Sequence, residues 1–365
     1  MANNQKLLEE LIDSRWLHAN RSHVFDEPAP WAGQRVASDR WRGMLVGLAI
    51  GDALGNTSEA MLLSDRRAKY GEIRDYLPNR HADSRSVGLP SDDTQLCFWA
   101  LETILERGWL DLSAYAQLLR ERHISGIGRT VSAFIKEYGK TGHWKSAAQD
   151  SAGNGALMRC PAALIPHLSD GSKALWADAA LFAAVTHNNW AAISSAVAFT
   201  AQLGALLVME RVPSPEWWCK RYAEIACPIE GGASIQMRGG EDSDYNGPVS
   251  SYVKTELPKA FADGLDVSNR GARWYSGAFL LETVPAVLYI LMHHADDPEE
   301  AIVQAVNHTR DNDTVAAIVG AAVGALHGES ALPQRWRNGL LGRTRESDDG
   351  QVQRILSALE DRLSL

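Results

Sequence analysis

The sequence predicts an all-α fold, a compact multi-helix bundle, and two observations support this. Alanine- and leucine-rich segments of helical length recur along the 365 residues, whereas alternating runs of β-branched residues, which are typical of strands, are few. No Asn-Gly or Asp-Gly turn joins two such runs, so hairpins are not expected. A composition of 45% hydrophobic and 22% charged residues is that of an ordinary globular protein.

The predicted helices follow one another along the chain, and residues that favour helix ends delimit several of them. Asp111 precedes one helix and Asp297 another, and an aspartate placed there accepts hydrogen bonds from the free N–H groups of the first turn. Gly108 and Gly328 each follow a helix, as glycine often does. Three segments are apolar nearly all round, which predicts burial at the centre of the bundle. The predicted ranges are 41–54, 94–107, 112–122, 173–185, 191–210, 277–293, 298–306 and 315–327.

Two stretches differ from this helical pattern. Residues 1–38 combine an apolar stripe with Trp16, Trp31 and several Arg, His and Pro residues, and we treat them as an N-terminal extension of a domain at 39–365. This extension either packs on its own domain or binds a partner, because Trp and Arg side chains dominate interface energetics. The stretch 228–248 is the longest irregular one, and such long loops in compact domains are usually functional or disordered.

Charge and cysteine content limit the classes of function. A net charge of −9 argues against a protein that binds nucleic acid by broad neutralisation of phosphates, although one cationic pocket or bound metal can hold a small anion. The four cysteines form no Cys-x-x-Cys pair and are expected to be buried thiols. The polar start lacks the apolar core of a secretion signal, and the uncharged stretch 190–209 is better explained as a core helix than as a membrane span. We therefore expect a cytoplasmic protein with no membrane partner.

Carboxylate oxygens placed before two helices are the chemistry that stands out. No Gly-x-Ser-x-Gly elbow, P-loop, His-Glu-x-x-His or zinc-type spacing occurs, which disfavours nucleophilic serine or cysteine chemistry. The motif "SDDT" (91–94) precedes one predicted helix and "DNDT" (311–314) another. Such residues cap helices, but each motif has more carboxylates than capping requires, and adjacent carboxylates repel unless a cation lies between them. If the two helix starts converge, they predict a site for a pair of Mg²⁺ or Mn²⁺ ions, which prefer oxygen ligands.

A glycine-rich helix carries a third acidic element. Glycine recurs at every fourth position through 43–55, although each glycine costs a soluble helix about 1 kcal/mol relative to alanine. Close contact with another helix explains such a stripe. Asp52 interrupts it and Glu59 follows it. A carboxylate in such apolar surroundings needs a partner, and a metal or its bound water would serve.

A fourth element is "GNGALMR" (153–159). Gly153 and Gly155 flank Asn154, so that backbone N–H groups can approach phosphate or ribose oxygens without obstruction, although Gly-Asn-Gly is also ordinary turn chemistry. Arg159 either pairs with a phosphate or forms a structural ion pair. His187, in "THNNW" (186–190), either touches a substrate or is a satisfied core or cap residue.

Taken in order, "GLAIGDALG", "SDDT", "GNGALMR", "TH" and "DNDTVAAIVGAAVGALHG" resemble the ADP-ribosylglycohydrolase family. The resemblance runs from about residue 39 to beyond residue 328. It implies an all-α fold with a binuclear Mg²⁺ or Mn²⁺ centre at the bottom of a cleft for ADP-ribose. The metal ligands that it implies by position are Glu59, Ser91, Asp92, Asp93, Asp311, Asp313 and Thr314.

The resemblance also implies an activity, which is removal of ADP-ribose from modified protein side chains, with arginine favoured. A carboxylate would accept a proton or stabilise a cationic sugar-like transition state, and the candidates are Asp92, Asp93, Asp313 and Glu59. Gly153, Asn154 and Gly155 would lie along the diphosphate and distal ribose of the substrate, with His187 and Arg159 as further substrate-binding residues.

Other functions stay open at this point. The chain could bind ADP-ribose without hydrolysing it, or hydrolyse another nucleoside-like substrate. It could also block a cognate ADP-ribosyltransferase toxin through residues 1–38, since family members can be protective partners of such toxins. Two positions depart from the family pattern, namely Ser91, where many members have Thr, and Thr309-Arg310, where many have Gly-Gly. Arg310 adds bulk and charge at the cleft edge, which leaves the substrate open.

Overall fold

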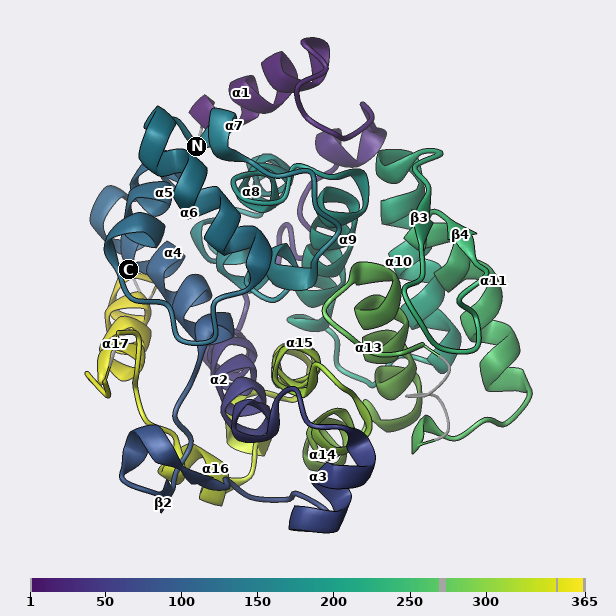
Figure 1. Ribbon diagram of the computed structural model, residues 1–365. Coiled ribbons are helices and arrows are strands. Elements are labelled where there is room, and N and C mark those ends of the chain that lie inside the picture. The colour runs from purple at the N-terminus through teal and green to yellow at the C-terminus, as the bar shows by residue number, and fades with distance from the viewer. Residues whose placement is uncertain (1, 269–273, 346, 364–365) are drawn as a thin grey trace.

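The structure is a computed structural model that describes residues 2–268, 274–345 and 347–363, and it confirms the predicted all-α fold (Figure 1). The named strands of these residues form two short antiparallel pairs, β1 (Pro78–Asn79) with β2 (Arg85–Ser86) and β3 (Ile235–Gln236) with β4 (Asn246–Gly247). The helices are α1 (Ala2–Asp13), α2 (Ser38–Gly55), α3 (Leu63–Tyr70), α4 (Asp92–Arg107), α5 (Leu112–Glu121), α6 (Arg129–Thr141), α7 (Trp144–Ala147), α8 (Ala174–Ala184), α9 (Trp190–Leu206), α10 (Pro215–Glu230), α11 (Val249–Ala262), α13 (Leu280–His294), α14 (Pro298–His308), α15 (Asn312–His327), α16 (Gln334–Gly339) and α17 (Gln351–Leu363).

Each predicted helical range overlaps one of these helices, although α13 begins three residues later than predicted, at Leu280, α2 begins three residues earlier, at Ser38, and α9 ends four residues earlier, at Leu206. The predicted caps are present, because the carboxylates of Asp111 and Asp297 accept hydrogen bonds from backbone N–H groups of the first turns of α5 and α14. The sequence analysis missed α3, α6, α7, α10, α11, α16 and α17. These helices are mostly amphipathic with polar outer faces, and α10 and α11 contain a proline, so they lack the Ala/Leu-rich signature.

Helices α2 and α15 pack along a seam of glycines at the centre of the molecule (Figure 1). A Cβ atom added at any glycine of the α2 stripe would lie well under 3 Å from the backbone of α15, at Gly324, Gly320, Ala316 and Asp313 in turn. The glycines of α15 meet the backbone of α2 in the same way. The close-contact interpretation of the stripe is therefore confirmed. Its last member, Gly55, lies against the backbone of Asp313 and so connects the seam to the acidic motif.

The N-terminal residues pack on the helices of the chain itself. Trp31 is only 1% exposed, its indole N–H donates to the carbonyl of His167 at 3.1 Å, and its ring lies over Gly204 of α9. Asn4 donates to Asp178 of α8 at 2.7 Å. Trp31 is therefore part of the core in this structure rather than an exposed anchor.

Two further expectations can be compared with the described residues. The stretch 228–248 is less irregular than predicted, because its first three residues end α10 and its middle forms the β3–β4 pair. Most of the stretch 190–209 forms the buried helix α9, which ends at Leu206, and among the described residues no helix has the length and apolarity needed to cross a bilayer. All four cysteines are free thiols; Cys97, Cys160 and Cys219 are buried as predicted, and Cys227 is half-buried.

Candidate functional site

The two predicted acidic motifs meet at one end of the α2–α15 pair. The hydroxyl of Thr314, at the start of α15, donates to Oδ2 of Asp93, at the start of α4, over 3.4 Å. The side-chain amide of Asn312 donates to the carbonyl of Gly55 at 3.1 Å and so joins the start of α15 to the end of α2. The close packing of α2 and α15 thus brings together the end of α2, the start of α4 and the start of α15, each of which carries acidic residues.

Asp52 supplies the cap of α4 from a neighbouring helix. Its carboxylate accepts hydrogen bonds from the backbone N–H groups of Ser91 and Thr94 at 2.8 to 3.1 Å, and from both of their hydroxyls at 2.5 Å. Asn56 adds a further donor at 3.1 Å. The partner of Asp52 is therefore the start of α4. Asp52 does not need a metal ion or its bound water as a partner, contrary to the expectation from the sequence. Because the Ser91 hydroxyl donates its hydrogen to Asp52, its oxygen lone pairs remain available to a cation.

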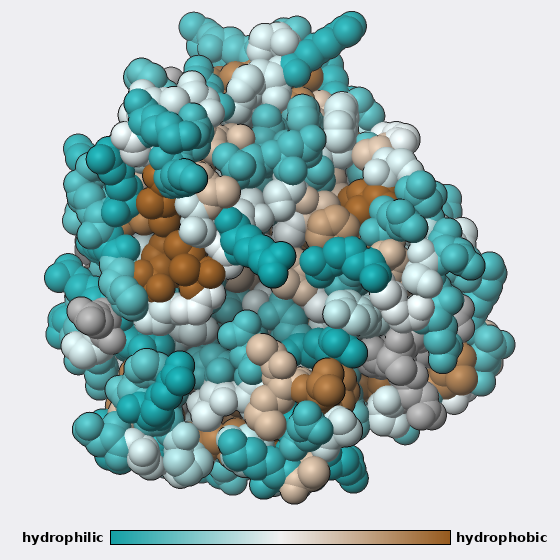
Figure 2. Space-filling model, viewed as in Figure 1, coloured by the Kyte–Doolittle hydropathy of each residue, from teal (hydrophilic) through white to brown (hydrophobic). Residues whose placement is uncertain are grey.

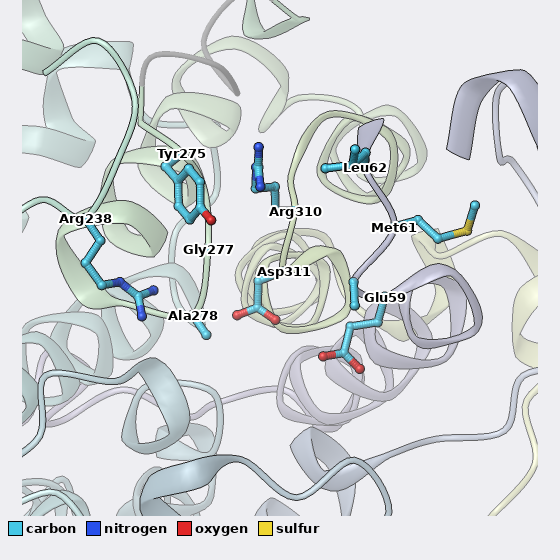
Figure 3. Close-up of a pocket in the computed structure, with 10 residues that line it drawn as sticks. Glu59, Met61, Leu62, Arg238, Tyr275, Gly277, Ala278, Arg310 and Asp311 are labelled. Atoms are coloured by element: carbon cyan, nitrogen blue, oxygen red, sulfur yellow. The ribbon is translucent and has the colours of Figure 1, made fainter. Parts of the chain in front are cut away.

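Three carboxylates border the solvent-facing side of the place where α2, α4 and α15 meet. Glu59, Asp311 and Asp313 each offer an oxygen within 4.8 Å of the others. Asp311 makes no capping bond to α15, contrary to the simple capping interpretation, and instead accepts a hydrogen bond from the Asn154 amide at 2.6 Å. Figure 3 shows the carboxylates of Asp311 and Glu59 facing the same cavity from the start of α15 and from the turn after α2.

Asp92 and Asp93 lie deeper, at the first turn of α4. Both are buried, and within the described residues Oδ1 of Asp93 has no hydrogen-bond partner. A buried carboxylate oxygen without a donor is costly, and a cation removes that cost. The set of carboxylate and hydroxyl oxygens therefore fits a hard divalent cation such as Mg²⁺ or Mn²⁺.

The carboxylates of the site destabilise one another's charged forms. Burial, followed by the charges of neighbouring carboxylates, raises the pKa values of Asp92, Asp93 and Asp313 well above the usual range. Burial and the charges of Asp311 and Asp52 raise the pKa of Glu59 to about 7. Protons and cations therefore compete for these oxygens near neutral pH.

This competition predicts how the stability of the metal-free protein depends on pH. A carboxyl group whose pKa is raised by folding stabilises the folded state below its ordinary pKa, and that contribution is lost as the pH rises through the raised value. In chelator, wild type and Asp313→Asn should melt at similar temperatures near pH 4, close to the ordinary pKa of an aspartate. At pH 8 the wild type should melt a few degrees lower, because Asn carries no charge to repel its neighbours. In thermal-shift measurements at pH 8, millimolar Mn²⁺ or Mg²⁺ should raise the melting temperature of the wild type more than that of the variant. Equal melting curves throughout would contradict the electrostatic account.

The Gly-Asn-Gly loop lies over His187. The ring of His187 would touch a Cβ placed at Gly155, 3.0 Å from Cε1, and Asn154 lies next to the site through its bond to Asp311. Thr186 holds the ring of this histidine in place. Its hydroxyl accepts a hydrogen bond from Arg159 at 2.7 Å and forms a hydrogen bond with Nδ1 of His187 at 2.7 Å, and Nε2 of the ring faces the loop. Burial and the charge of Arg159 lower the pKa of His187 well below its usual value, so the ring is neutral.

The structure corrects the assignment of Arg159 to substrate binding. Arg159 is 0% exposed, and its guanidinium donates to the carbonyl oxygens of Gly155 at 2.7 Å and Phe182 at 3.1 Å as well as to Thr186. No carboxylate of the described residues pairs with it, so the structural ion pair was also wrong. Arg159 supports the loop from beneath and cannot reach a phosphate.

Two cavities open beside the acidic site and share Glu59. The smaller one has a volume of about 390 Å³ and the larger one about 840 Å³, and Figure 2 shows polar side chains around the hollow on this face. The larger cavity reaches Ser91 and the loop at Gly126. The residues that line the smaller cavity are Glu59, Ala60, Met61, Leu62, Arg238, Tyr275, Gly277, Ala278, Arg310 and Asp311.

Among the residues of this cavity that sequence reasoning missed, three come from segments distant in sequence from the acidic motif at 311–314 or from Glu59. Arg238 lies in the β3–β4 hairpin, and Tyr275 and Ala278 lie in the segment before α13. Nothing marks these positions in the sequence except that 228–248 is a long loop. Their place in the site depends on contacts with Glu282 of α13 and with Arg310, which are distant in sequence.

Comparisons with known proteins find similar sequences and a similar fold. The family described as ADP-ribosylglycohydrolase matches residues 33–364. The chain is 25% identical over 335 residues to the ADP-ribosylarginine hydrolase Tri1 of Pseudomonas putida, covering 88% of this chain and 77% of that protein. It is 24% identical over 327 residues to the ADP-ribosyl-[dinitrogen reductase] glycohydrolase of Rhodospirillum rubrum, covering 87% and 96%. The fold is similar, with a TM-score of 0.62 and 23% identity over 90% of this chain and 99% of the other, to a solved structure described as an ADP-ribosylglycohydrolase-related protein complex.

Proposed function

Because the chain belongs to the ADP-ribosylglycohydrolase family, as the match over residues 33–364 shows, we propose that it hydrolyses the bond between ADP-ribose and a modified protein side chain. The acceptor that we favour is arginine, because a relative over most of the chain is named an ADP-ribosylarginine hydrolase. The observation that carries the proposal is the convergence of carboxylate and hydroxyl oxygens where α4, α15 and the end of α2 meet.

Two divalent cations, Mg²⁺ or Mn²⁺, are the cofactor that we propose for this convergence. Ions bound there would fix the hydroxyls of the distal ribose and lower the pKa of a bound water. The unpartnered oxygen of Asp93 and the raised pKa values of the carboxylates support the proposal, since cations relieve both. The residues that would hold the ions are Glu59, Ser91, Asp92, Asp93, Asp311, Asp313 and Thr314.

The side chains of the site then take distinct roles. Glu59, at the open side of the site, is suited to accept a proton from the attacking water. Asp92, Asp93 and Asp313 offset the positive charge that develops on the ribose as its bond to the acceptor nitrogen breaks. Water adds to the anomeric carbon, and the proton passes to the leaving guanidine nitrogen, which yields free ADP-ribose and unmodified arginine.

The Gly-Asn-Gly loop positions the substrate in this proposal. Asn154 orients Asp311 through its side-chain amide. The N–H groups of Gly153 and Asn154 already donate to the Ser151 hydroxyl and to the carbonyl of Ala278, so we assign the N–H of Gly155 to the oxygens of the diphosphate or distal ribose. His187, neutral and with Nε2 toward the loop, supports it from below.

A comparison of acceptors tests the proposal. With Mg²⁺ present, we expect proteins ADP-ribosylated on a guanidine nitrogen to lose ADP-ribose at least about tenfold faster, in kcat/KM, than proteins modified on a hydroxyl oxygen, which corresponds to about 1.4 kcal/mol of transition-state discrimination. Released ADP-ribose is measured by chromatography. Faster release from the oxygen-linked substrate would contradict the arginine assignment, and tight binding without release would favour a non-catalytic reader.

Hydrolysis rather than occlusion of a toxin is the function we propose. Blocking a transferase through residues 1–38 would require this segment to present its aromatic anchors to a partner. Trp31 is buried against α9, and Trp16 packs edge-on against Trp144 at a ring distance of 5.5 Å. These contacts stabilise the domain itself.

A further inference from the structure

We propose that Arg310, held by Tyr275 at the rim of the smaller cavity, recognises an acidic residue of the acceptor polypeptide beside the modified side chain. This inference rests on the hydrolysis proposed above and adds the chemistry of the protein substrate, namely a segment with Asp or Glu next to the modification. Three features carry it: a fixed guanidinium, a charge without a partner and an exposed apolar neighbour.

The guanidinium of Arg310 is fixed before any substrate arrives. It lies 4.2 Å from the centre of the Tyr275 ring, within the range of a cation–π interaction. Tyr275 and Ser276 have φ values of 60° and 42°, a strained conformation for residues other than glycine that persists only where the surroundings impose it. Here the carbonyl of Ser276 accepts hydrogen bonds from the N–H groups of Arg310 at 3.3 Å and Asp311 at 3.1 Å. The strained turn and the Arg310 segment therefore hold each other in place.

In the part of the chain that the structure describes, the charge of Arg310 has no ion-pair partner, whereas the other arginine in the cavity has one. Arg238 donates twice to the carboxylate of Glu282, each time at 2.9 Å, and lies 4.6 Å from the centre of the Phe279 ring. Within the described residues, no carboxylate forms an ion pair with Arg310. Figure 3 shows the Arg310 side chain extending away from the carboxylate of Asp311, between Tyr275 and Leu62. Arg310 can therefore offer its charge to a group that arrives at the rim.

The neighbours of Arg310 suit a polypeptide. Leu62 lines the cavity and is 51% exposed, and Met61 lies beside it. An apolar side chain left in water next to a fixed cation is the arrangement of a small interaction surface.

The charges around the site indicate which charge the acceptor segment carries. The chain carries a net charge of −9, and the carboxylates of the site add a local negative field. An acidic acceptor segment would be repelled by both unless a cation at the rim attracted it, and Arg310 is placed to do this. A basic segment would meet repulsion from Arg310 at the same position.

The test uses peptides that carry one ADP-ribosylated arginine followed by Glu, Gln or Lys. Wild type, Arg310→Ala and Arg310→Glu are compared, with Arg211→Glu as a control of equal charge change. Arg211 is exposed and lies two residues from Met209, near the far end of α15, where Arg40 donates to the carbonyls of Met209 and Ala325. Three quantities are measured: kcat and KM with Mg²⁺, peptide binding by fluorescence anisotropy in chelator, and the inhibition constant of free ADP-ribose.

We expect wild type and Arg211→Glu to bind the Glu peptide about tenfold better than the Lys peptide, which corresponds to about 1.4 kcal/mol, and Arg310→Glu to reverse this order. The effect should appear in KM, with kcat nearly unchanged, and the inhibition constant of free ADP-ribose should stay constant in Arg310→Ala. An unchanged order in Arg310→Glu would overturn the inference. A rise in the inhibition constant equal to that in KM would also overturn it, because Arg310 would then contact the diphosphate of ADP-ribose itself.

The same experiment separates failure of the inference from failure of the proposed function. Turnover of all three peptides at equal efficiency would leave the hydrolase intact and reject the role of Arg310. Selective binding of the Glu peptide without turnover would support the role of Arg310 and reject the hydrolase. Neither binding nor turnover would reject both.

Discussion

Replacing Asp311 and Asp313 together by alanine is expected to abolish the release of ADP-ribose, with a loss of at least about 1,000-fold in kcat/KM. The expectation follows because both carboxylates belong to the group of oxygens within 4.8 Å, and removal even of a residue behind a metal ligand costs about 10- to 100-fold in metal affinity or activity. The free energy of unfolding in chelator should not fall, since the change removes two mutually repelling charges. Isothermal titration with Mn²⁺ should show the loss of cation binding directly.

A double alanine variant of Asp263 and Asp361 is the matched control, because both are exposed aspartates at the ends of other helices, α11 and α17. This control should keep wild-type turnover and Mn²⁺ binding. Turnover that survives in the Asp311/Asp313 variant with Mg²⁺ present would show that the metal assignment is wrong. Circular dichroism would exclude unfolding as the reason for any loss.

Substitution of Gly51 by alanine should strongly lower the free energy of unfolding. An added Cβ would lie well under 3 Å from the carbonyl oxygen of Ala316, and this atom belongs to the backbone of α15, which cannot move aside as a side chain can. We expect a loss of about 3 kcal/mol or more in the free energy of unfolding, at the upper end of what overpacking costs. Because Gly55 and Asp313 lie further along the same seam, Mn²⁺ affinity should fall as well.

Gly139 provides the control for this prediction. It lies within α6, and an added Cβ would meet nothing within 4 Å. Gly139→Ala should therefore stabilise the protein by up to about 1 kcal/mol, through helix propensity alone. Chemical denaturation measures both variants. Similar effects at Gly51 and Gly139 would contradict the close contact between α2 and α15.

The sequence was most informative where local pattern and function coincide. The Ala/Leu-rich helices are buried on nearly all sides, so their composition alone predicts them, as α9 and α15 illustrate. The motifs at 91–94 and 311–314 contain more carboxylates than capping requires. In the structure the hydroxyl of Thr314 lies 3.4 Å from Oδ2 of Asp93. The spacing of the glycines indicated a close helix contact, although the sequence did not identify α15 as the partner.

Long-range contacts explain what the sequence did not predict. Asp52 caps α4 across a distance of 39 residues, which no local capping rule detects. Arg159 resembles a phosphate ligand beside a glycine loop, but the packing of Phe182 and Thr186 buries it completely. Arg238 reaches the cavity from a hairpin that carries little strand signal.

The central claim is that the oxygens gathered between α4, α15 and the end of α2 use divalent cations to free ADP-ribose from modified arginine. The most direct measurement is the amount of ADP-ribose released from an arginine-ADP-ribosylated protein by the wild type, in excess Mg²⁺ or Mn²⁺ and in chelator at the same pH. We predict rapid release with the cation, loss of release in chelator, and recovery when the cation is restored. Equal release in chelator, or no release under either condition, would contradict the account.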